Sequence, residues 1–230
     1  FLAKSSFKEY LSFVEAQGEV EFMHLINSIT TNLTFFFREN HHFEYLASDV
    51  IPELLKRNAA NKKIRIWSAG CSTGEEPYSI SILLKECVPA GWDAKVIATD
   101  LDSNVVQTGI NGVYKIDRLK GVSDARKKRW FLKGGGSQLG FVKVKPELQS
   151  MIEFSQLNLM SEWPLKERID AIFCRNVVIY FDKPTQATLF NRYADTLPDS
   201  GHLFVGHSES LYKVCDRFEL LGQTIYKKIK

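Results

Sequence analysis

The first sixty residues carry hydrophobic side chains three or four positions apart, which is the spacing of one face of an α-helix. A capping-box pattern, Ser6 followed by Glu9, opens the first of three such runs. The polar stretch 57–63 ends the pattern, so we predict an all-helical N-terminal domain over residues 1–60. The apolar positions of the three runs are Phe7, Tyr10, Leu11 and Val14; Phe22, Leu25, Ile26 and Ile29; and Phe43, Leu46, Ile51, Leu54 and Leu55.

From Ile64 onward, short apolar runs alternate with helical segments. This alternation is typical of a mostly parallel, doubly wound (Rossmann-like) α/β sheet, which we predict over residues 61–230. Inside it, glycines between two short apolar runs predict a small inserted antiparallel β-subdomain at about 130–146. The predicted strands span 64–68, 96–99, 152–154, 169–173, 202–205 and 224–229, and the predicted helices span 77–86, 103–111 and 184–197.

Composition narrows the class of protein. Apolar residues make up 44% of the chain, but no window approaches the ~18 apolar residues that a membrane span needs. The first residues lack the order of a secretion signal, and the absence of an initiating Met suggests a fragment trimmed at its start. The four cysteines form no Cys-x-x-Cys pair, which excludes a zinc knuckle and a disulfide framework. We therefore expect a cytoplasmic protein.

The net charge of +3 is unevenly distributed. Residues 113–149 contain ten Lys or Arg and three Asp or Glu, whereas the rest of the chain is mildly acidic. Such a basic segment indicates either a surface that meets an acidic partner or a solvated face. Composition alone leaves both interpretations open.

The residues that follow each predicted strand are the candidates for ligand binding, because ligands of open parallel sheets bind at the carboxyl ends of the strands. After the first strand, Gly70 and Gly74 allow a sharp turn, and two carboxylates, Glu75 and Glu76, open the next helix. Carboxylates there would repel a triphosphate and suit a cationic ligand. After the second strand, Asp100 stands where such folds bind ribose hydroxyls.

Two further strand ends complete the pattern. Asn158 and Leu159 could bracket an adenine, and Arg175 and Asn176 form a polar pair that a ligand or a structural partner, Asp170 or Glu76, must satisfy. Together these features indicate a ligand with an adenosine half and a cationic amino-acid half, and S-adenosylmethionine fits. A strand-end aspartate can also only cap a helix, which is the role expected of Asp102.

Four segments make the pattern specific enough to indicate a family. They are ITTNLTFFFRE (29–39), WSAGCSTGEEPYS (67–79), FCRNVVIYF (173–181) and GHSE (206–209). In order and in spacing, from about Ile29 to Tyr226, they resemble the CheR-type chemotaxis receptor methyltransferases. The resemblance implies a helical domain packed on a methyltransferase domain with an inserted β-subdomain, and a cofactor between the two main domains.

The resemblance also assigns roles to single residues. Arg38 and Tyr180 would lie near the transferring methyl group, which makes them the candidate catalytic residues. Asn32, Thr34 and Arg38 would reach the cofactor from the N-terminal domain. The residues that would hold it from the sheet side are Glu75, preferred to its neighbour Glu76, with Asp100, Asn158, Leu159, Arg175 and Asn176, and the Gly70 turn lies beside them.

The implied activity is that of an S-adenosylmethionine-dependent protein-glutamate O-methyltransferase, which releases S-adenosylhomocysteine and needs no metal. A Glu carboxylate is ionised at neutral pH, with a pKa near ~4.3, so no general base is required. The expected partners are cytoplasmic Glu-rich helices of methyl-accepting chemotaxis receptors, with a receptor tail added to an edge strand of the β-subdomain. The candidate docking residues are Arg126, Lys127, Arg129 and Lys143.

Other functions are weighed against this one. A nucleic-acid methyltransferase could use the basic segment, but the Asn/Asp-Pro-Pro-Tyr motif of DNA amino-methylating enzymes is missing, so no nucleic acid is expected. A small-molecule methyltransferase would not need the basic hairpin. A non-catalytic S-adenosylmethionine-binding docking module would not need Arg38 and Tyr180. His41 and His42 point about 100° apart on a helix and predict no metal site.

Overall fold

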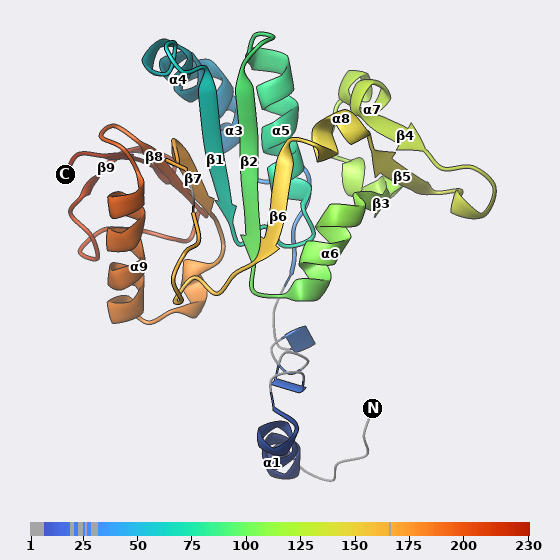
Figure 1. The fold of residues 1–230 in the computed structure, drawn as a ribbon, viewed down its shortest axis with the longest axis vertical. Helices are drawn as coiled ribbons and strands as arrows, with labels where there is room; N and C mark the ends of the chain where they lie inside the picture. The colour runs from blue at the N-terminus through green and yellow to red at the C-terminus, as the bar shows by residue number, and fades with distance from the viewer. Residues whose placement is uncertain (1–6, 19–20, 23–24, 26, 29–31, 166) are drawn as a thin grey trace.

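A mixed seven-stranded sheet forms the centre of the computed structural model, which describes residues 7–18, 21–22, 25, 27–28, 32–165 and 167–230 (Figure 1). The strand order is β6-β2-β1-β7-β8-β10-β9. The first five strands of this order pair in parallel, whereas β10 pairs antiparallel with β8 and β9. The bounds are β1 (Lys63–Ala69), β2 (Asp93–Asp100), β6 (Ile152–Gln156), β7 (Ala171–Cys174), β8 (His202–Val205), β9 (Phe218–Gly222) and β10 (Ile225–Lys228).

Successive residues of the central strands belong to two buried clusters, one on each face of the sheet. Ala171 and Phe173 of β7 join a cluster with α3, α4 and α5, while Ile172 and Cys174 join a cluster with α9. Burial on both faces explains why these strands are continuous apolar runs in the sequence. The helices are α3 (His41–Tyr45), α4 (Ile51–Arg57), α5 (Glu75–Cys87), α6 (Ser103–Asn111) and α9 (Lys183–Thr196), with a π-helical turn, η1 (Leu46–Val50), joining α3 to α4.

The predicted alternation of strands and helices from residue 61 onward is confirmed. Among the strands of the large sheet that the structure describes, the pattern does not reveal β9, which lies at the edge and pairs with β10. Of its five residues only Phe218 is buried. An edge strand with one buried side chain gives little hydrophobic signal.

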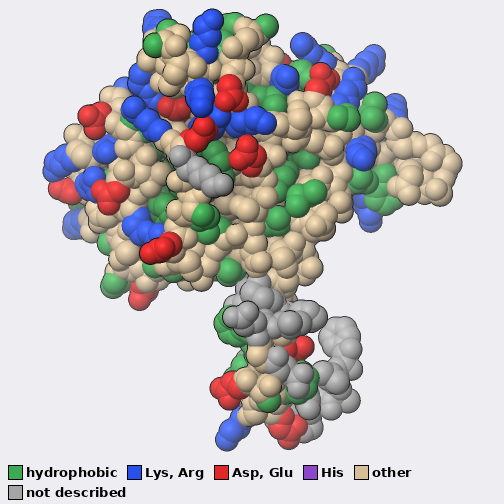
Figure 2. Space-filling view, in the orientation of Figure 1, with side chains coloured by type: hydrophobic (Ala, Val, Ile, Leu, Met, Phe, Trp, Pro, Cys, Tyr) green, Lys and Arg blue, Asp and Glu red, His purple; other side chains and the backbone are tan. Residues whose placement is uncertain are grey.

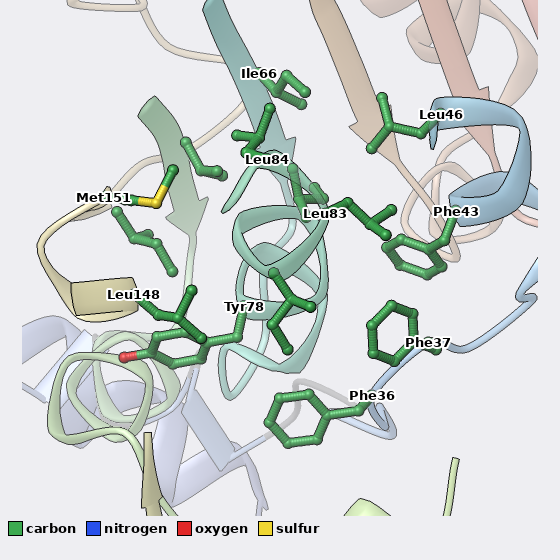
Figure 3. Close-up of a cluster of buried hydrophobic side chains, with 14 of the residues drawn as sticks. Phe36, Phe37, Phe43, Leu46, Ile66, Tyr78, Leu83, Leu84, Leu148 and Met151 are labelled. Atoms are coloured by element: carbon green, nitrogen blue, oxygen red, sulfur yellow. The ribbon is translucent and has the colours of Figure 1, made fainter. Parts of the chain in front are cut away.

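The N-terminal region is helical where the structure describes it. α1 (Phe7–Gln17) lies apart from the sheet in Figure 1, whereas Phe43 and Leu46 pack in the same cluster as the sheet and α5 (Figure 3). Of the expected positions, Ser6, Ile26 and Ile29 lie outside the described residues. The separate all-helical domain over residues 1–60 therefore stays a prediction.

The inserted β-subdomain is larger than the predicted hairpin. Its sheet has the order β3-β5-β4, because Val113 pairs with Lys143 on the free side of the hairpin. One strand of the hairpin, β4, therefore keeps a free edge, whereas the strand of Lys143 is central and β3 forms the other edge. The elements are β3 (Val113–Lys115), η2 (Ile116–Leu119), α7 (Asp124–Trp130), β4 (Phe131–Lys133), η3 (Gly136–Gln138), β5 (Phe141–Val144) and α8 (Pro146–Gln149).

The β-subdomain packs firmly onto the main body. Phe36 contacts the rings of Tyr114 and Phe131 edge to face, with centroids 5.2 and 5.4 Å apart.

Among the helices that the structure describes, none combines the length and apolar character required to cross a membrane.

Candidate functional site

A cavity of about 380 Å³ opens at the carboxyl ends of β1, β2, β6 and β7. This is the edge of an open parallel sheet where ligands bind, and the volume lies within the ~300–1,000 Å³ usual for small-molecule sites. The candidate catalytic and cofactor-binding residues line this cavity, with Glu75 as the exception. The lining candidates are Asn32, Thr34, Arg38, Gly70, Asp100, Asn158, Leu159, Arg175, Asn176 and Tyr180.

The turn after β1 depends on Gly70. Its φ is +101°, and a Cβ there would lie 2.3 Å from Cγ2 of Val177. The N–H groups of Gly70 and Cys71 donate to the Thr99 carbonyl at 2.8 and 2.9 Å. Only glycine accommodates both this φ and this approach, so the bare backbone forms part of the cavity wall.

Asp100 places a carboxylate at the end of β2. Its oxygens accept hydrogen bonds from the N–H groups of Ser72 (2.8 Å) and Asp102 (3.1 Å). Burial raises the pKa of Asp100, and these N–H groups offset part of the rise. Each oxygen keeps further acceptor capacity toward the cavity. Asp102, in contrast, caps α6 by accepting from the Asn104 N–H at 2.8 Å, as predicted.

A second wall comes from residues 32–38. The side-chain amide of Asn32 donates to the Asp102 carboxylate at 3.1 Å, which attaches this segment to the end of β2. Nη1 of Arg38 donates to the Leu33 carbonyl at 2.6 Å. The second contact fixes the Arg38 guanidinium close to its own loop while the side chain lines the cavity.

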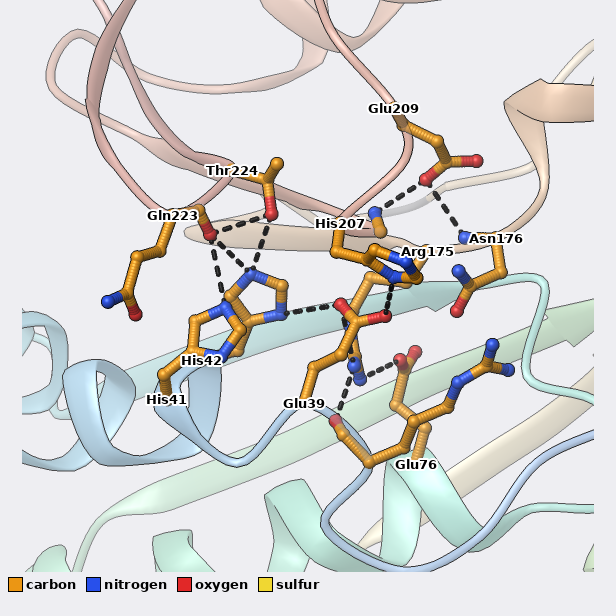
Figure 4. A network of polar contacts seen from close by, with 12 residues as sticks. Glu39, His41, His42, Glu76, Arg175, Asn176, His207, Glu209, Gln223 and Thr224 are labelled. Carbon is orange, nitrogen blue, oxygen red and sulfur yellow. Dashed lines mark hydrogen bonds and ion pairs between the residues drawn. The ribbon is translucent and has the colours of Figure 1, made fainter.

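Arg175 joins this segment to the sheet (Figure 4). Its guanidinium lies 3.0 Å from Glu76 and 3.3 Å from Glu39, and it also donates to the Arg38 carbonyl. The Arg175 side chain is 2% exposed, so these contacts satisfy a buried charge. Of the two structural partners considered for Arg175, Glu76 is confirmed, whereas Asp170 pairs with another arginine.

The two acids that share Arg175 have different electrostatics. Burial raises the pKa of Glu76, and Arg175 and the Ser68 hydroxyl offset only part of that rise. Burial acts in the same direction on Glu39, but Arg175 and His207 together bring the pKa of Glu39 below its ordinary value. Two carboxylates facing one guanidinium leave this part of the cavity wall suited to a cation.

Glu75 does not line the cavity. Its side chain is 1% exposed, accepts a hydrogen bond from the Thr73 hydroxyl at 2.6 Å and lies 3.6 Å from Arg118. Arg118 also donates to the Thr34 carbonyl at 2.8 Å, so it connects the β-subdomain to the cavity wall. The preference for Glu75 over Glu76 at the ligand is thus not supported by this placement. Adjacent residues of a helix point about 100° apart, and in α5 it is Glu76 that points toward the cavity.

Tyr180 and Leu159 also line the cavity, Tyr180 with an exposed ring and Leu159 with a buried apolar side chain. Tyr180, in η4 (Val178–Tyr180), is 62% exposed at the cavity mouth. Leu159 is buried in the loop after β6, whose shape is set by its carbonyl accepting from Trp163 (3.0 Å) and Arg192 (2.6 Å). Leu159 and Asn158 thus give the cavity an apolar wall beside a side-chain amide.

Glu209 is a buried acid whose role the sequence did not indicate. Its carboxylate accepts hydrogen bonds from four backbone N–H groups, of Asn176, Val177, Ile179 and Gly206. The only sequence signal was an acidic residue at the end of the GHSE motif. Three of these donors, Asn176, Val177 and Ile179, lie about thirty residues earlier in the chain, which no local pattern can show.

The histidines near the cavity belong to a structural cluster. Glu39, His41 and His42 present potential metal ligands within 4.8 Å of one another. However, Glu39 is held by Arg175, and Nε2 of His42 contacts the Gln223 carbonyl at 3.0 Å. Burial, with the nearby Arg175 charge, lowers the pKa of His42 to about 3. A further cation would meet the same repulsion from that guanidinium.

The candidate docking residues differ in their surroundings, although Lys and Arg side chains gather over the β-subdomain (Figure 2). Arg126 makes a bidentate pair with Glu86, with a shortest distance of 2.6 Å, and lies over the Phe37 ring. Arg129 stacks on a tryptophan, Lys127 pairs with an aspartate, and Lys143 is exposed. Arg126 is therefore part of the packing between the β-subdomain and the body.

Comparison with known proteins agrees with this geometry. A family model described as "CheR methyltransferase, SAM binding domain" matches residues 32–227. The chemotaxis protein methyltransferase of Salmonella typhimurium is 43% identical over 98% of this chain and 77% of its own length. Chemotaxis protein methyltransferase 2 of Pseudomonas aeruginosa is 43% identical over 98% of this chain and 79% of its own. The chain belongs to the CheR methyltransferase family.

Proposed function

We propose that this chain is an S-adenosylmethionine-dependent protein-glutamate O-methyltransferase acting on methyl-accepting chemotaxis receptors. The observation that carries the proposal is the cavity itself. It combines the Asp100 and Glu76 carboxylates, three side-chain amides and an apolar wall within one space of about 380 Å³. The names of the relatives, which are chemotaxis protein methyltransferases, support the same activity and the same class of substrate.

The donor set fits S-adenosylmethionine. We assign to Asp100 the role of accepting hydrogen bonds from the ribose hydroxyls, and to Asn158 and Leu159 contact with the edge and face of the adenine. Glu76, with Glu39 behind it, offers negative charge to the cationic amino-acid half. We assign this role to Glu76 in preference to Glu75, because Glu76 lines the cavity. The bare backbone at Gly70 leaves room for close approach.

The chemistry asks little of the protein beyond positioning. Bound S-adenosylmethionine supplies an electrophilic methyl group on a sulfonium centre, and the substrate glutamate is already ionised, with a pKa near ~4.3. An in-line displacement between opposite charges gains from orientation and exclusion of water and needs no proton transfer. Arg38 and Tyr180, at the cavity wall and mouth, are our candidates for orienting the substrate carboxylate.

The β-subdomain and its basic segment are our candidate docking surface for the receptor. Lys143 and Arg129 are exposed there, next to the three-residue edge strand β4. Positive charge would raise the encounter rate with Glu-rich receptor helices, and a free strand edge could pair with an extended receptor tail.

The decisive experiment measures transfer of a labelled methyl group from S-adenosylmethionine to receptor-enriched membranes. We expect incorporation into receptor bands, and release of the label as methanol after mild alkali, because carboxyl esters hydrolyse and N-methyl groups do not. Calorimetric titration with S-adenosylhomocysteine should show one site per chain. Binding without transfer would indicate a docking module, and alkali-stable label would exclude glutamate as the acceptor.

A further inference from the structure

Glu209 is a buried carboxylate without a cationic partner. It is 4% exposed, and none of the ion pairs among the described residues includes it. Burial raises its pKa, and hydrogen bonds from backbone N–H groups offset part of the rise. A carboxylate buried without a counterion costs folding free energy, which its hydrogen bonds must offset. An apolar side chain could not make those hydrogen bonds.

Those hydrogen bonds connect two separate loops. One carboxylate oxygen accepts from Asn176 at 2.9 Å and from Gly206 at 2.5 Å, and the other accepts from Val177 at 2.9 Å and Ile179 at 3.3 Å. Figure 4 shows the Glu209 carboxylate directed at the Asn176 backbone. The carboxylate thus binds the loop after β7 to the end of β8.

The loop after β7 needs such support. Asn176 has a φ of +59°, a left-handed conformation that side-chain-bearing residues adopt at a cost in free energy. Three N–H groups of this loop point at one place, which is the arrangement of a backbone anion nest. An internal carboxylate in this nest stabilises the loop without occupying the cavity.

The same loop forms one wall of the cavity. Asn176, Val177 and Tyr180 line it, and the Asn176 amide packs against Gly206 so closely that a Cβ there would lie 2.4 Å from Nδ2. We propose that Glu209 is a positioning residue of the cofactor pocket, fixing Asn176 and Tyr180 by binding the backbone behind them. This inference rests on the proposed function, because it assumes that the cavity holds S-adenosylmethionine.

Asp170 offers a matched control at the amino end of β7, the strand whose carboxyl-end loop Glu209 binds. It is also 4% exposed, but it precedes β7, where it accepts from the Arg65 N–H at 2.9 Å and pairs with Arg57 at 2.7 Å. Asp170 therefore stabilises the opposite end of the strand. A merely structural role for Glu209 predicts that both acids behave alike, whereas a positioning role predicts different behaviour toward the cofactor.

The test compares Glu209→Gln with Asp170→Asn. A Gln side chain has one oxygen for four donors and turns its own N–H₂ toward two of them. We expect both variants to lower the thermal midpoint, whereas S-adenosylhomocysteine affinity in calorimetric titration should fall fivefold or more in Glu209→Gln alone. A smaller loss in Glu209→Gln, or an equal loss in Asp170→Asn, overturns the inference.

Gly206→Ala decides the matter if Glu209→Gln does not fold. The added methyl group would lie 2.4 Å from Nδ2 and 2.9 Å from the backbone nitrogen of Asn176, so this part of the cavity wall should shift and a fivefold or larger loss of affinity is again expected. Wild-type affinity in Gly206→Ala would overturn the proposed coupling of this junction to the pocket. The wild-type titration separates the two levels: if the wild-type chain does not bind S-adenosylhomocysteine, the proposed function itself fails.

Discussion

The two ends of β7 handle buried charge in opposite ways. At the amino end, Asp170 pairs with Arg57 and accepts from Asn58 and from backbone, so its charge is neutralised within the fold. At the carboxyl end, Arg175 faces two acids, and the donors to Glu209 among the described residues are all backbone N–H groups. The first arrangement stabilises the sheet, whereas the second leaves negative charge at the cavity, where a cationic ligand would complete it.

Breaking the central ion pair at each end should give the largest difference. Arg175→Leu leaves Glu76 and Glu39 buried without a cation, so we expect unfolding free energy to fall by about 3–5 kcal/mol and cofactor binding to be lost. Arg57→Leu removes a charged hydrogen bond from a side chain that is 23% exposed, with a loss of about 1.5–3 kcal/mol and unchanged binding. Urea titration and calorimetry measure both, and equal effects would remove the contrast.

A substitution of Asp100 tests whether the carboxyl edge of the sheet binds the ligand. Asp100→Ala removes a charged acceptor worth about 1.5–3 kcal/mol, so affinity for S-adenosylhomocysteine should fall at least tenfold. The control is Asp182→Ala. The Asp182 carboxylate caps α9 by accepting from the Thr185 N–H at 2.9 Å, and it does not line the cavity. The control should cost about 1 kcal/mol of stability and no affinity. Unchanged affinity in Asp100→Ala would rule out the ribose assignment.

Arg38 and Tyr180 should affect the transfer step and leave stability nearly unchanged. Tyr180 is 62% exposed, and substitutions at such positions usually change stability by less than about 0.5 kcal/mol. We expect Arg38→Ala and Tyr180→Phe to lower kcat at saturating cofactor at least tenfold, which corresponds to about 1.4 kcal/mol of barrier. Labelled-methyl incorporation is the measurement. Full activity in either variant would exclude that residue from the reaction.

Two buried histidines, His42 in α3 and His202 in β8, should make the stability of the fold sensitive to acid. Burial lowers the pKa of His42 to about 3 and that of His202 to about 4. The unfolded chain binds a proton near pH 6.5 and the folded chain does not, so stability should fall as pH drops below about 6.5, by up to ~1.4 kcal/mol per pH unit and histidine. His42→Gln and His202→Gln should each flatten the profile measured by urea unfolding between pH 7 and 4.5. A variant with the wild-type slope contradicts the assignment for its histidine.

The smallest effect is expected at the β-subdomain, away from both ends. Reversing Arg129 and Lys143 to Glu should raise the receptor KM about two- to fivefold at low salt. The difference should shrink as salt rises, because the Debye length is about 10 Å at 0.1 M. Arg126→Glu is the comparison: it breaks the contact with Glu86 and should lower the thermal midpoint at every salt concentration. A salt-independent KM defect in the first variant would place docking elsewhere.

Local patterns were sufficient to predict the strands and the loops that surround the cavity. Parallel strands bring their carboxyl ends to one edge, so polar residues after each strand, such as Asp100 and Asn158, could be expected to meet there. The apolar runs of β7 and β8 are continuous because both faces are buried. These features depend only on neighbouring residues.

What the sequence missed depends on contacts between distant residues. The choice between Glu75 and Glu76 depends on the rotation of α5, which its packing sets. Arg175, which pairs with Glu39, lies more than a hundred residues away along the chain, and three of the four donors to Glu209 lie about thirty residues away. Likewise, β5 is a central strand only because Val113 pairs with it, and no local pattern near β5 shows that pairing.

The residues that line the cavity are far apart in the sequence, and this separation has a consequence for folding. Its residues come from segments near 32–38, 70–76, 99–101, 157–159 and 175–181, so no part of the sheet alone can form the site. Contacts of such high sequence separation form slowly, because loop closure precedes any compensating contact energy. A ligand therefore binds only chains that have finished folding. By mass action, a ligand at a hundred times its Kd would add about 2.7 kcal/mol to native-state stability, so abundance of the cofactor would set the fraction of chains that is unfolded at equilibrium.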